Sequence, residues 1–310
     1  MFIRIKVAWW MYHPGDSKPP EHSALVTQAE FVLPGTYRVV EESLLKQGSH
    51  DTGEVTINYV EVGEGDPLVL LHGFTSDWRS WSQEIGLLSH RWRVLVPDAR
   101  GHGGSARSED REYGYGARIR DAASFIRATA GVPAVVIGHS MGGATAMGIA
   151  ALHPELVRAA VLEDPHVSSA SGFPDEARVW MEGNRAFLRT SPSFGEAVDG
   201  MNANSNKDAA AHRLDASQAV KMDPETYNPF IDDAMFDAFD PGTVLSQVKC
   251  PVLLLQADPK QGGVVGNSAA EHIRTGVSDC THVKLDVGHS IHKDAPINFR
   301  RSVFDFLDTI

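Results

Sequence analysis

A serine flanked by glycines, directly after an apolar run, is the feature that most constrains the fold of this 310-residue chain. Residues 134–137 are apolar, a Gly-x-Ser-x-Gly motif occupies residues 138–142, and a stretch of small residues follows. A serine on a sharp turn between a strand and a helix needs small neighbours, because its backbone is strained there. The pattern therefore predicts a nucleophile elbow that lifts the hydroxyl group of Ser140 clear of a sheet.

Two backbone N–H groups are expected beside that hydroxyl group. The N–H of Met141 belongs to the first turn of the expected helix, where donors favour negative charge. The second comes from the end of an apolar strand at 67–71, where Gly73 allows a tight turn and Phe74 follows. We predict that Phe74 and Met141 form an oxyanion hole, and that His72 holds the loop in a structural role.

Apolar strands and helices alternate along most of the chain. Runs without polar alternation, which are typical of buried parallel strands, lie at 67–71, 92–96, 134–137, 159–162 and 251–255. This alternation predicts an α/β fold with a doubly wound, mostly parallel sheet. Residues 166–241 contain helical stretches, at 175–188 and 208–220, and no strong strand pattern, which indicates a helical cap insertion.

These patterns predict three parts of the chain. Residues 1–36 form an N-terminal arm, residues 37–165 and 242–310 form the α/β core, and residues 166–241 form the cap. Eight apolar cap side chains either line a pocket or form the core of the cap itself: Phe173, Trp180, Met181, Phe187, Phe194, Met201, Met222 and Phe230.

Charged side chains near the expected strand after residue 92 need a separate interpretation. Asp98 follows that strand, where we expect a hydrogen bond that ties the loop, or a pair with Arg100, rather than catalysis. The next helix spans 113–130 and is expected to turn four charged side chains toward solvent: Arg118, Arg120, Asp121 and Arg127.

A nucleophilic serine needs a general base, and the chain has fourteen histidines. His289 follows Gly288 just past the last expected strand, which suits a base held on a loop. His292 is the competitor, and it also fits a position in the pocket or at the start of the following helix. The order of nucleophile first and histidine last is that of α/β-hydrolases.

From about Glu41 to its end, the chain resembles the α/β-hydrolase fold serine hydrolases. The segments that carry the resemblance are His72-Gly-Phe, residues 98–103, the 138–143 elbow and Gly288-His289. The resemblance implies that Ser140 is the nucleophile and His289 is the base.

The same resemblance bears on two further assignments. It implies that the N–H groups of Phe74 and Met141 form the oxyanion hole. It favours His289 over His292 because family members carry an acidic residue and a proline shortly after the histidine, here Asp294 and Pro296.

In this family an acidic residue orients the histidine and completes a catalytic triad with the serine. At this acidic residue the chain departs from the family pattern. Most members carry the acid beyond the strand that here spans 252–255, at a position near Lys260, whereas Asp258 lies two residues earlier. Some members take it from the end of the preceding strand, which here carries Asp164, while Glu163 would point the other way. We favour Asp164 and retain Asp258 as the alternative orienter of the base.

The composition of the chain indicates which binding partners and which cellular location to expect. A net charge of −12 argues against nucleic acid or an anionic membrane as the main partner. Two cysteines, Cys250 and Cys280, form no disulfide framework, and no apolar run is long enough for a membrane span, so we expect a cytoplasmic protein. A homodimer remains open, and no metal or cofactor is expected.

The sequence supports three functional hypotheses. The first is a cofactor-free serine hydrolase that cleaves a small-molecule carboxylic ester or lactone through an acyl-enzyme. The second is a carbon–carbon bond hydrolase or a haloperoxidase-like enzyme that uses the same triad. The third is a receptor-like hydrolase fold that binds a ligand with little turnover, because the fold and triad do not fix function.

Overall fold

A computed structural model describes residues 45–167, 175–202, 209–236, 239 and 241–310 of the chain. The N-terminal arm predicted at 1–36 lies outside these residues. Eight strands form one sheet in the order β1-β2-β4-β3-β5-β6-β7-β8. Their bounds are β1 Lys46–Asp51, β2 Thr56–Val62, β3 Pro67–Leu71, β4 Arg93–Pro97, β5 Ala134–His139, β6 Val157–Glu163, β7 Val252–Gln256 and β8 Cys280–Lys284.

The sheet is parallel from β4 to β8, whereas β1 and β2 add an antiparallel edge. The predicted doubly wound, mostly parallel sheet is therefore confirmed. Its central strands are apolar on both faces because helices cover both. In β3, for example, Val69 and Leu71 belong to one core cluster and Leu68 and Leu70 belong to the other.

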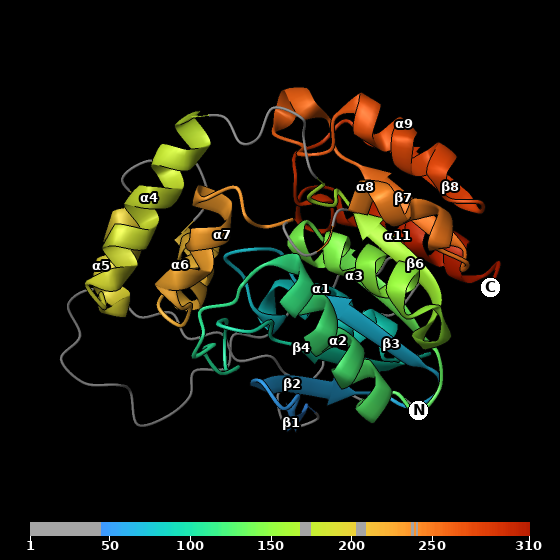
Figure 1. The fold of residues 1–310 in the computed structure, drawn as a ribbon, viewed down its shortest axis with the longest axis horizontal. Helices are drawn as coiled ribbons and strands as arrows, with labels where there is room; N and C mark the ends of the chain where they lie inside the picture. Colours follow the sequence, from blue (N-terminus) through green and yellow to red (C-terminus); the bar gives the residue numbers. More distant parts are fainter. Residues whose placement is uncertain (1–44, 168–174, 203–208, 237–238, 240) are drawn as a thin grey trace, which may run out of the picture.

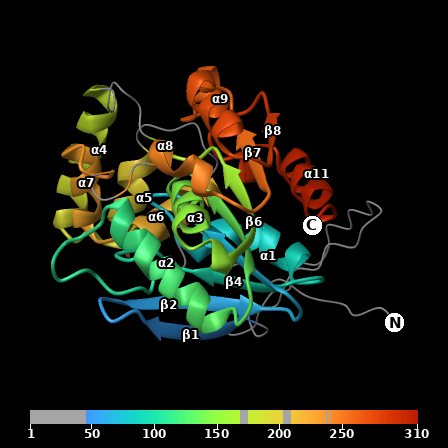
Figure 2. The ribbon, with the colours of Figure 1, turned by 45° about the vertical axis from the view of Figure 1, so that its right-hand side comes forward.

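Helices α2 and α3 pack on one face of the sheet, and α1 and α11 pack on the other (Figure 2). The helices outside the insertion are α1 Ser82–Leu88, α2 Tyr115–Thr129, α3 Met141–Leu152, α8 Pro241–Val244, α9 Asn267–Gly276, α10 Ile291–Asp294 and α11 Pro296–Leu307. The 3-10 turn at Trp78–Trp81 leads into α1.

A helical insertion separates β6 from β7 and lies beside the sheet in both views of the ribbon (Figures 1 and 2). Its helices are α4 Asp175–Arg189, α5 Phe194–Asn202, α6 Ala209–Ala219 and α7 Asn228–Ile231. Helices α4 and α6 match the predicted stretches, but α5 was not predicted. Within the described residues of this insertion no strand is present, which agrees with the sequence pattern.

The prediction that α2 turns all four of its charged side chains to solvent is wrong for two of them. Arg118 is 3% exposed and Asp121 is 5% exposed. Positions three apart share one face of a helix, and this face packs on the sheet, where Arg100 pairs with Asp121. Arg120 and Arg127 lie on the outer face and are exposed.

The search for membrane-spanning segments covered only the described residues, and none of their helices is both long and apolar enough to cross a bilayer.

Candidate active site

The elbow is built by close backbone packing around Ser140. The serine has φ 53° and ψ −113°, a conformation that is strained for a residue with a side chain. A Cβ atom at Gly138 would lie 2.2 Å from the carbonyl oxygen of Gly142, and one at Gly142 would lie 2.2 Å from that of Leu71. Only glycine fits at these two positions, so the motif of the sequence has a direct steric cause.

His289 and Asp164 are brought together by this fold. The Nδ1–H of His289 donates a hydrogen bond of 2.6 Å to Oδ2 of Asp164. The His289 ring lies 4.6 Å from the ring of His139, centroid to centroid, and His139 directly precedes Ser140. Nε2–H of His139 also donates to the carbonyl oxygen of His289 at 3.1 Å, which fixes the histidine loop against the elbow.

The carboxylate of Asp164 is fully buried and receives backbone donors from the segment after β7. The N–H groups of Val264 (2.8 Å), Ala257 (3.2 Å) and Val265 (3.3 Å) all donate to it. Asp164 itself has φ 38°, a left-handed conformation that turns its side chain toward this segment. These three donors and His289 together satisfy the hydrogen-bonding capacity of this buried carboxylate.

Asp258, the alternative acid, lies in a different environment. Its carboxylate is on the surface, where Oδ1 accepts the N–H of Lys260 at 3.1 Å and caps the 3-10 turn Pro259–Gln261. That hydrogen bond holds the pKa of Asp258 below its usual value. The carboxylate therefore stabilises its own turn, and His289 is bonded to Asp164 instead.

His292, the competing histidine, is buried on the opposite side of β6. Its backbone N–H and its ring Nδ1–H each donate a 2.8 Å hydrogen bond to Oε1 of Glu163. Its ring stacks on Trp81 at 4.5 Å. The prediction that Glu163 and Asp164 point in opposite directions is therefore confirmed, and each carboxylate holds one histidine.

The loop that carries Phe74 is tied as expected. Nε2 of His72 accepts the N–H of Ala99 at 2.9 Å, and its Nδ1–H donates to the carbonyl oxygen of Gly73 at 2.8 Å. A Cβ atom at Gly73 would lie 2.6 Å from the His139 ring, so this loop lies directly against the elbow. Such a Cβ atom would also lie 3.5 Å from Cβ of Ser140, so Phe74 directly follows a residue that touches the nucleophile, and the oxyanion hole of Phe74 and Met141 stays a prediction.

The loop after β4 is also tied as expected. Asp98 accepts the N–H groups of Trp78 and Gly104, each at 2.8 Å. Its expected alternative, a pair with Arg100, does not form, because Arg100 pairs with Asp121.

Sequence reasoning missed His166, which lies two residues after Asp164. Its N–H donates to the carbonyl oxygen of Ser140 at 3.0 Å, and its Nδ1 lies 2.7 Å from the hydroxyl oxygen of Tyr115. Burial and the neighbouring His289 lower the pKa of His166 to about 4, so its ring is neutral at pH 7. The signal in the sequence was its place directly beyond the end of an apolar strand.

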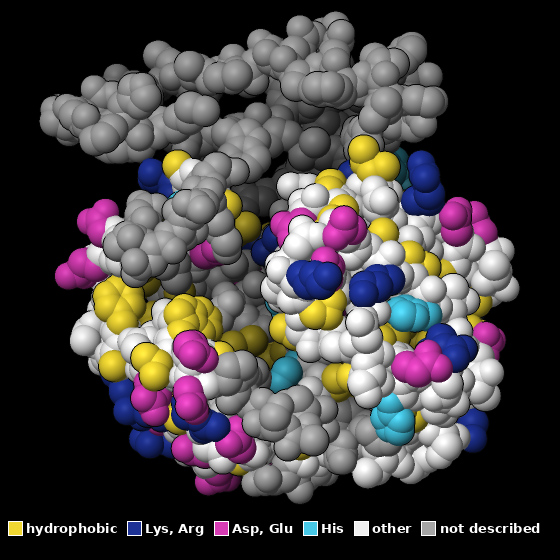
Figure 3. Space-filling view, turned by 90° about the horizontal axis from the view of Figure 1, so that it is seen from above, with side chains coloured by type: hydrophobic (Ala, Val, Ile, Leu, Met, Phe, Trp, Pro, Cys, Tyr) yellow, Lys and Arg dark blue, Asp and Glu magenta, His cyan; other side chains and the backbone are white. Residues whose placement is uncertain are grey.

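Aromatic side chains of the insertion approach the elbow. The ring of Phe230 lies 4.3 Å from Phe74 and 5.4 Å from His166. Seen from above, the surface is hollowed between the insertion and the sheet region, with hydrophobic side chains at its border (Figure 3). Among the predicted pocket residues, Trp180 and Phe194 are largely exposed, while Phe173 and the Met201 side chain lie outside the described part.

The described residues contain no group of three or more His, Cys, Asp or Glu side chains placed to hold a metal ion. Cys250 and Cys280 are both free thiols.

Comparison with known proteins identifies the family of the chain. The sequence pattern of the alpha/beta hydrolase fold family matches residues 66–296. The chain belongs to the alpha/beta hydrolase fold family. Among solved structures of this fold, the enol-lactonase from Burkholderia xenovorans LB400 superposes with a TM-score of 0.69 at 20% identity, over 84% of this chain and 100% of that one.

The names of two relatives illustrate the range of chemistry among similar proteins. The 2-hydroxy-6-oxo-6-(2'-aminophenyl)hexa-2,4-dienoic acid hydrolase of Metapseudomonas resinovorans is 40% identical over 36% of this chain and 40% of that enzyme. This chain thus spans less than half of that enzyme's length. The N-formylmaleamate deformylase of Pseudomonas putida is 30% identical over 79% of this chain and 90% of that enzyme.

Proposed function

We propose that this alpha/beta hydrolase is a cofactor-free serine hydrolase that cleaves a carboxylic ester or lactone through an acyl-enzyme on Ser140. The observation that carries the proposal is the strained serine at the start of α3, together with a histidine that packs on the neighbouring His139 and is oriented by a buried carboxylate. A serine, a histidine and an acid in this order and geometry are the parts of a nucleophilic triad.

Each group has a defined step in the proposed reaction. Ser140 attacks the carbonyl carbon while His289 takes its proton through Nε2, and Asp164 stabilises the imidazolium through Nδ1. The N–H groups of Phe74 and Met141 stabilise the negative oxygen of the tetrahedral intermediate. His289 then protonates the leaving alcohol, and a water molecule activated by the same histidine releases the acid.

Carbon–carbon bond hydrolysis is the second candidate reaction, and the partial match to a dienoic acid hydrolase favours it. In that case the same groups act on a carbonyl that is flanked by a carbon leaving group. Several relatives are named for acidic substrates, including N-formylmaleamate and 2-(acetamidomethylene)succinate. An acidic substrate is therefore compatible with either reaction.

Covalent labelling with a fluorophosphonate, followed by peptide mapping, tests the proposal directly. We expect one adduct, on Ser140, and turnover of 4-nitrophenyl esters that falls about 10⁶-fold in Ser140→Ala. Turnover of a ring-cleavage dienone that exceeds ester turnover would favour carbon–carbon hydrolysis. A wild-type protein that neither labels nor turns over either substrate would contradict both reactions and favour the ligand-binding alternative.

A further inference from the structure

His139 is the last residue of β5 and directly precedes the nucleophile. It is buried, with 7% of its surface exposed. It has no step in the proposed reaction, in which His289 is the base. Its ring nevertheless touches the loop that carries the base and the loop that carries Phe74, so its contacts need an explanation of their own.

The first contact is with the main chain of the base. The Nε2–H of His139 donates to the carbonyl oxygen of His289 at 3.1 Å, although the two residues are 150 positions apart in the chain. In the part of the chain that the structure describes, this is the only hydrogen bond made by the backbone of Gly288 or His289. The position of the base on its loop therefore depends on this one donor.

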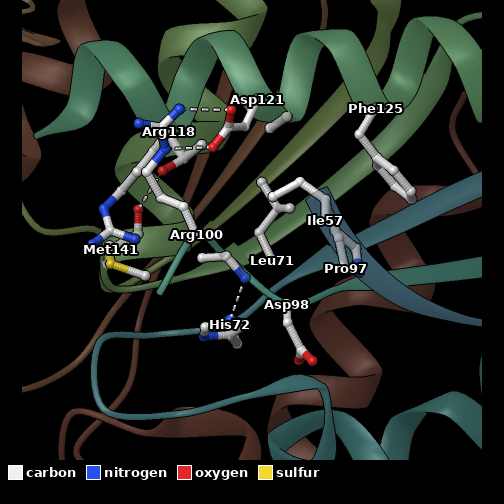
Figure 4. Close-up of a pocket in the computed structure, with 14 residues that line it drawn as sticks. Ile57, Leu71, His72, Pro97, Asp98, Arg100, Arg118, Asp121, Phe125 and Met141 are labelled. Atoms are coloured by element: carbon white, nitrogen blue, oxygen red, sulfur yellow. Dashed lines mark hydrogen bonds and ion pairs between the residues drawn. The ribbon is translucent and has the colours of Figure 1, made fainter. Parts of the chain in front are cut away.

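The second contact is with the loop after β3. A Cβ atom at Gly73 would lie 2.6 Å from Nδ1 of His139, so the ring lies directly against the residue before Phe74. His72 ties the same loop to the end of β4, because its Nε2 accepts the N–H of Ala99 (Figure 4). Two histidines thus hold this loop, and His139 is the one that also reaches the base.

The charge and the tautomer of His139 follow from its surroundings. Burial lowers its pKa well below the usual value, and the neighbouring His289 and His292 lower it further. The ring is therefore neutral at pH 7 and carries one N–H group. Because Nε2 faces a carbonyl oxygen, which only accepts, that N–H group is on Nε2. A neutral ring adds no charge beside the imidazolium that forms on His289.

We propose that His139 is a positioning residue for the base, and that its Nε2–H fixes the main chain of His289 so that the imidazole keeps its bond to Asp164 and its reach to Ser140. The inference rests on the proposed hydrolase function and adds a residue to its machinery. His139 acts through His289 and touches no reacting atom. A displacement of about 1 Å at a catalytic group costs on the order of 10²-fold in rate, which sets the size of the expected effect.

Two substitutions separate the hydrogen bond of His139 from the packing of its ring. His139→Gln keeps an N–H donor close to the position of Nε2 but removes the ring, whereas His139→Phe keeps a ring without the donor. With 4-nitrophenyl butyrate, we expect kcat to fall about 30- to 100-fold in His139→Phe, while KM changes by less than about threefold. In His139→Gln, kcat should stay within about fivefold of the wild type.

His50→Phe is the matched control. It also removes one ring hydrogen bond, to the hydroxyl oxygen of Ser124 at 2.9 Å, but on the edge strand β1. We expect it to leave kcat unchanged. If His139→Phe does not fold, His139→Met replaces it, because it also fills space without supplying a donor.

Proton NMR tests the positioning without turnover. The Nδ1–H protons of His289 and His292 each lie in a hydrogen bond to a buried carboxylate, of Asp164 and Glu163, and should resonate far downfield. The signal that is lost in Asp164→Asn belongs to His289. In His139→Phe we expect this signal to broaden or disappear while that of His292 remains, and in His139→Gln we expect both to remain.

The outcomes separate this inference from the proposed function. If the wild type hydrolyses the ester and His139→Phe is equally fast, or if His139→Gln loses as much as His139→Phe, the donor does not position the base and the inference is wrong. A wild type that hydrolyses no ester contradicts the ester-hydrolase proposal instead. In that case an unchanged His289 signal in folded His139→Phe would still overturn the role of His139.

Discussion

The carboxyl ends of β6 and β7 carry the same dipeptide, Asp-Pro, yet the two aspartates have opposite environments. The strands are paired neighbours in the sheet. Asp164 directly follows β6 and is fully buried, whereas Asp258 lies one residue further beyond β7 and is on the surface. The backbone conformations differ: Asp164 is left-handed, with φ 38°, whereas Asp258 is extended, with φ −78° and ψ 118°, and begins a 3-10 turn.

The carboxyl ends of β6 and β7 are also joined by hydrogen bonds. The segment after β7, which carries Asp258, supplies three backbone N–H groups to Asp164. Asp258 caps the short turn within that segment. The β6 end therefore contributes the charge, and the β7 end contributes the backbone donors that stabilise it.

The largest expected effect is a difference in kcat between substitutions of the two aspartates. Asp164→Asn should lower kcat for ester hydrolysis by about 10⁴-fold, because an amide no longer stabilises the correct tautomer and the imidazolium of His289. Asp258→Asn should stay within about threefold of the wild type. Steady-state kinetics at pH 7.5 measures both, and equal losses in the two variants would remove the distinction drawn here.

A second variant compares the roles of Glu163 and Asp164, the two adjacent acidic residues at the end of β6. Glu163→Gln removes the charge from a buried pair with His292 and should lower the free energy of unfolding by about 3 kcal/mol. Urea unfolding measures the change, and Glu155→Gln on the exposed turn before β6 is the control. Folded Glu163→Gln should still be labelled by a fluorophosphonate at Ser140; loss of labelling in folded protein would place Glu163 in the catalytic machinery.

The smallest expected effect concerns pH. His166, just past β6, has a pKa lowered to about 4, so the unfolded chain takes up a proton below pH 6.5 that the folded protein does not. This histidine should therefore cost stability as pH falls from 6.5 to 4, at no more than about 1.4 kcal/mol per pH unit.

Urea unfolding at pH 7.5 and pH 5 tests whether the free energy of unfolding falls on acidification. The loss on acidification should be smaller in His166→Asn than in the wild type. His282→Asn, in β8 next to β7, should change the loss less, because that ring is only partly buried. A larger effect of His282→Asn would mean that the β7 side is the more acid-sensitive one.

Local sequence predicted the strands, the elbow and the histidine because each depends on neighbours in the chain. Apolar runs mark strands that are covered on both faces, and residues 138 and 142 are glycines because a Cβ atom at either would lie 2.2 Å from a backbone oxygen. The pairing of His289 with Asp164 was one of two alternatives. It depends on a left-handed turn at Asp164 and on donors from a distant segment, which no local pattern encodes.

The burial of Arg118 was missed for a similar reason. Its neighbours on α2 are charged, and a helix with several charged positions normally turns them to solvent. Arg100, from the loop after β4, lies under the inner face of α2 and pairs there with Asp121. The buried side of this helix is therefore partly polar. Only the contact between two segments shows which arginine faces inward.

The backbone donors that bond Asp164 come from residues beyond the helical insertion, so the acid and its donors lie on either side of it in the chain. Pairing between β6 and β7 closes this long loop at its base. A graft between residues 168 and 240 would leave Asp164 and its three donors in the chain, but it would remove the contacts of Phe230 with Phe74 and His166.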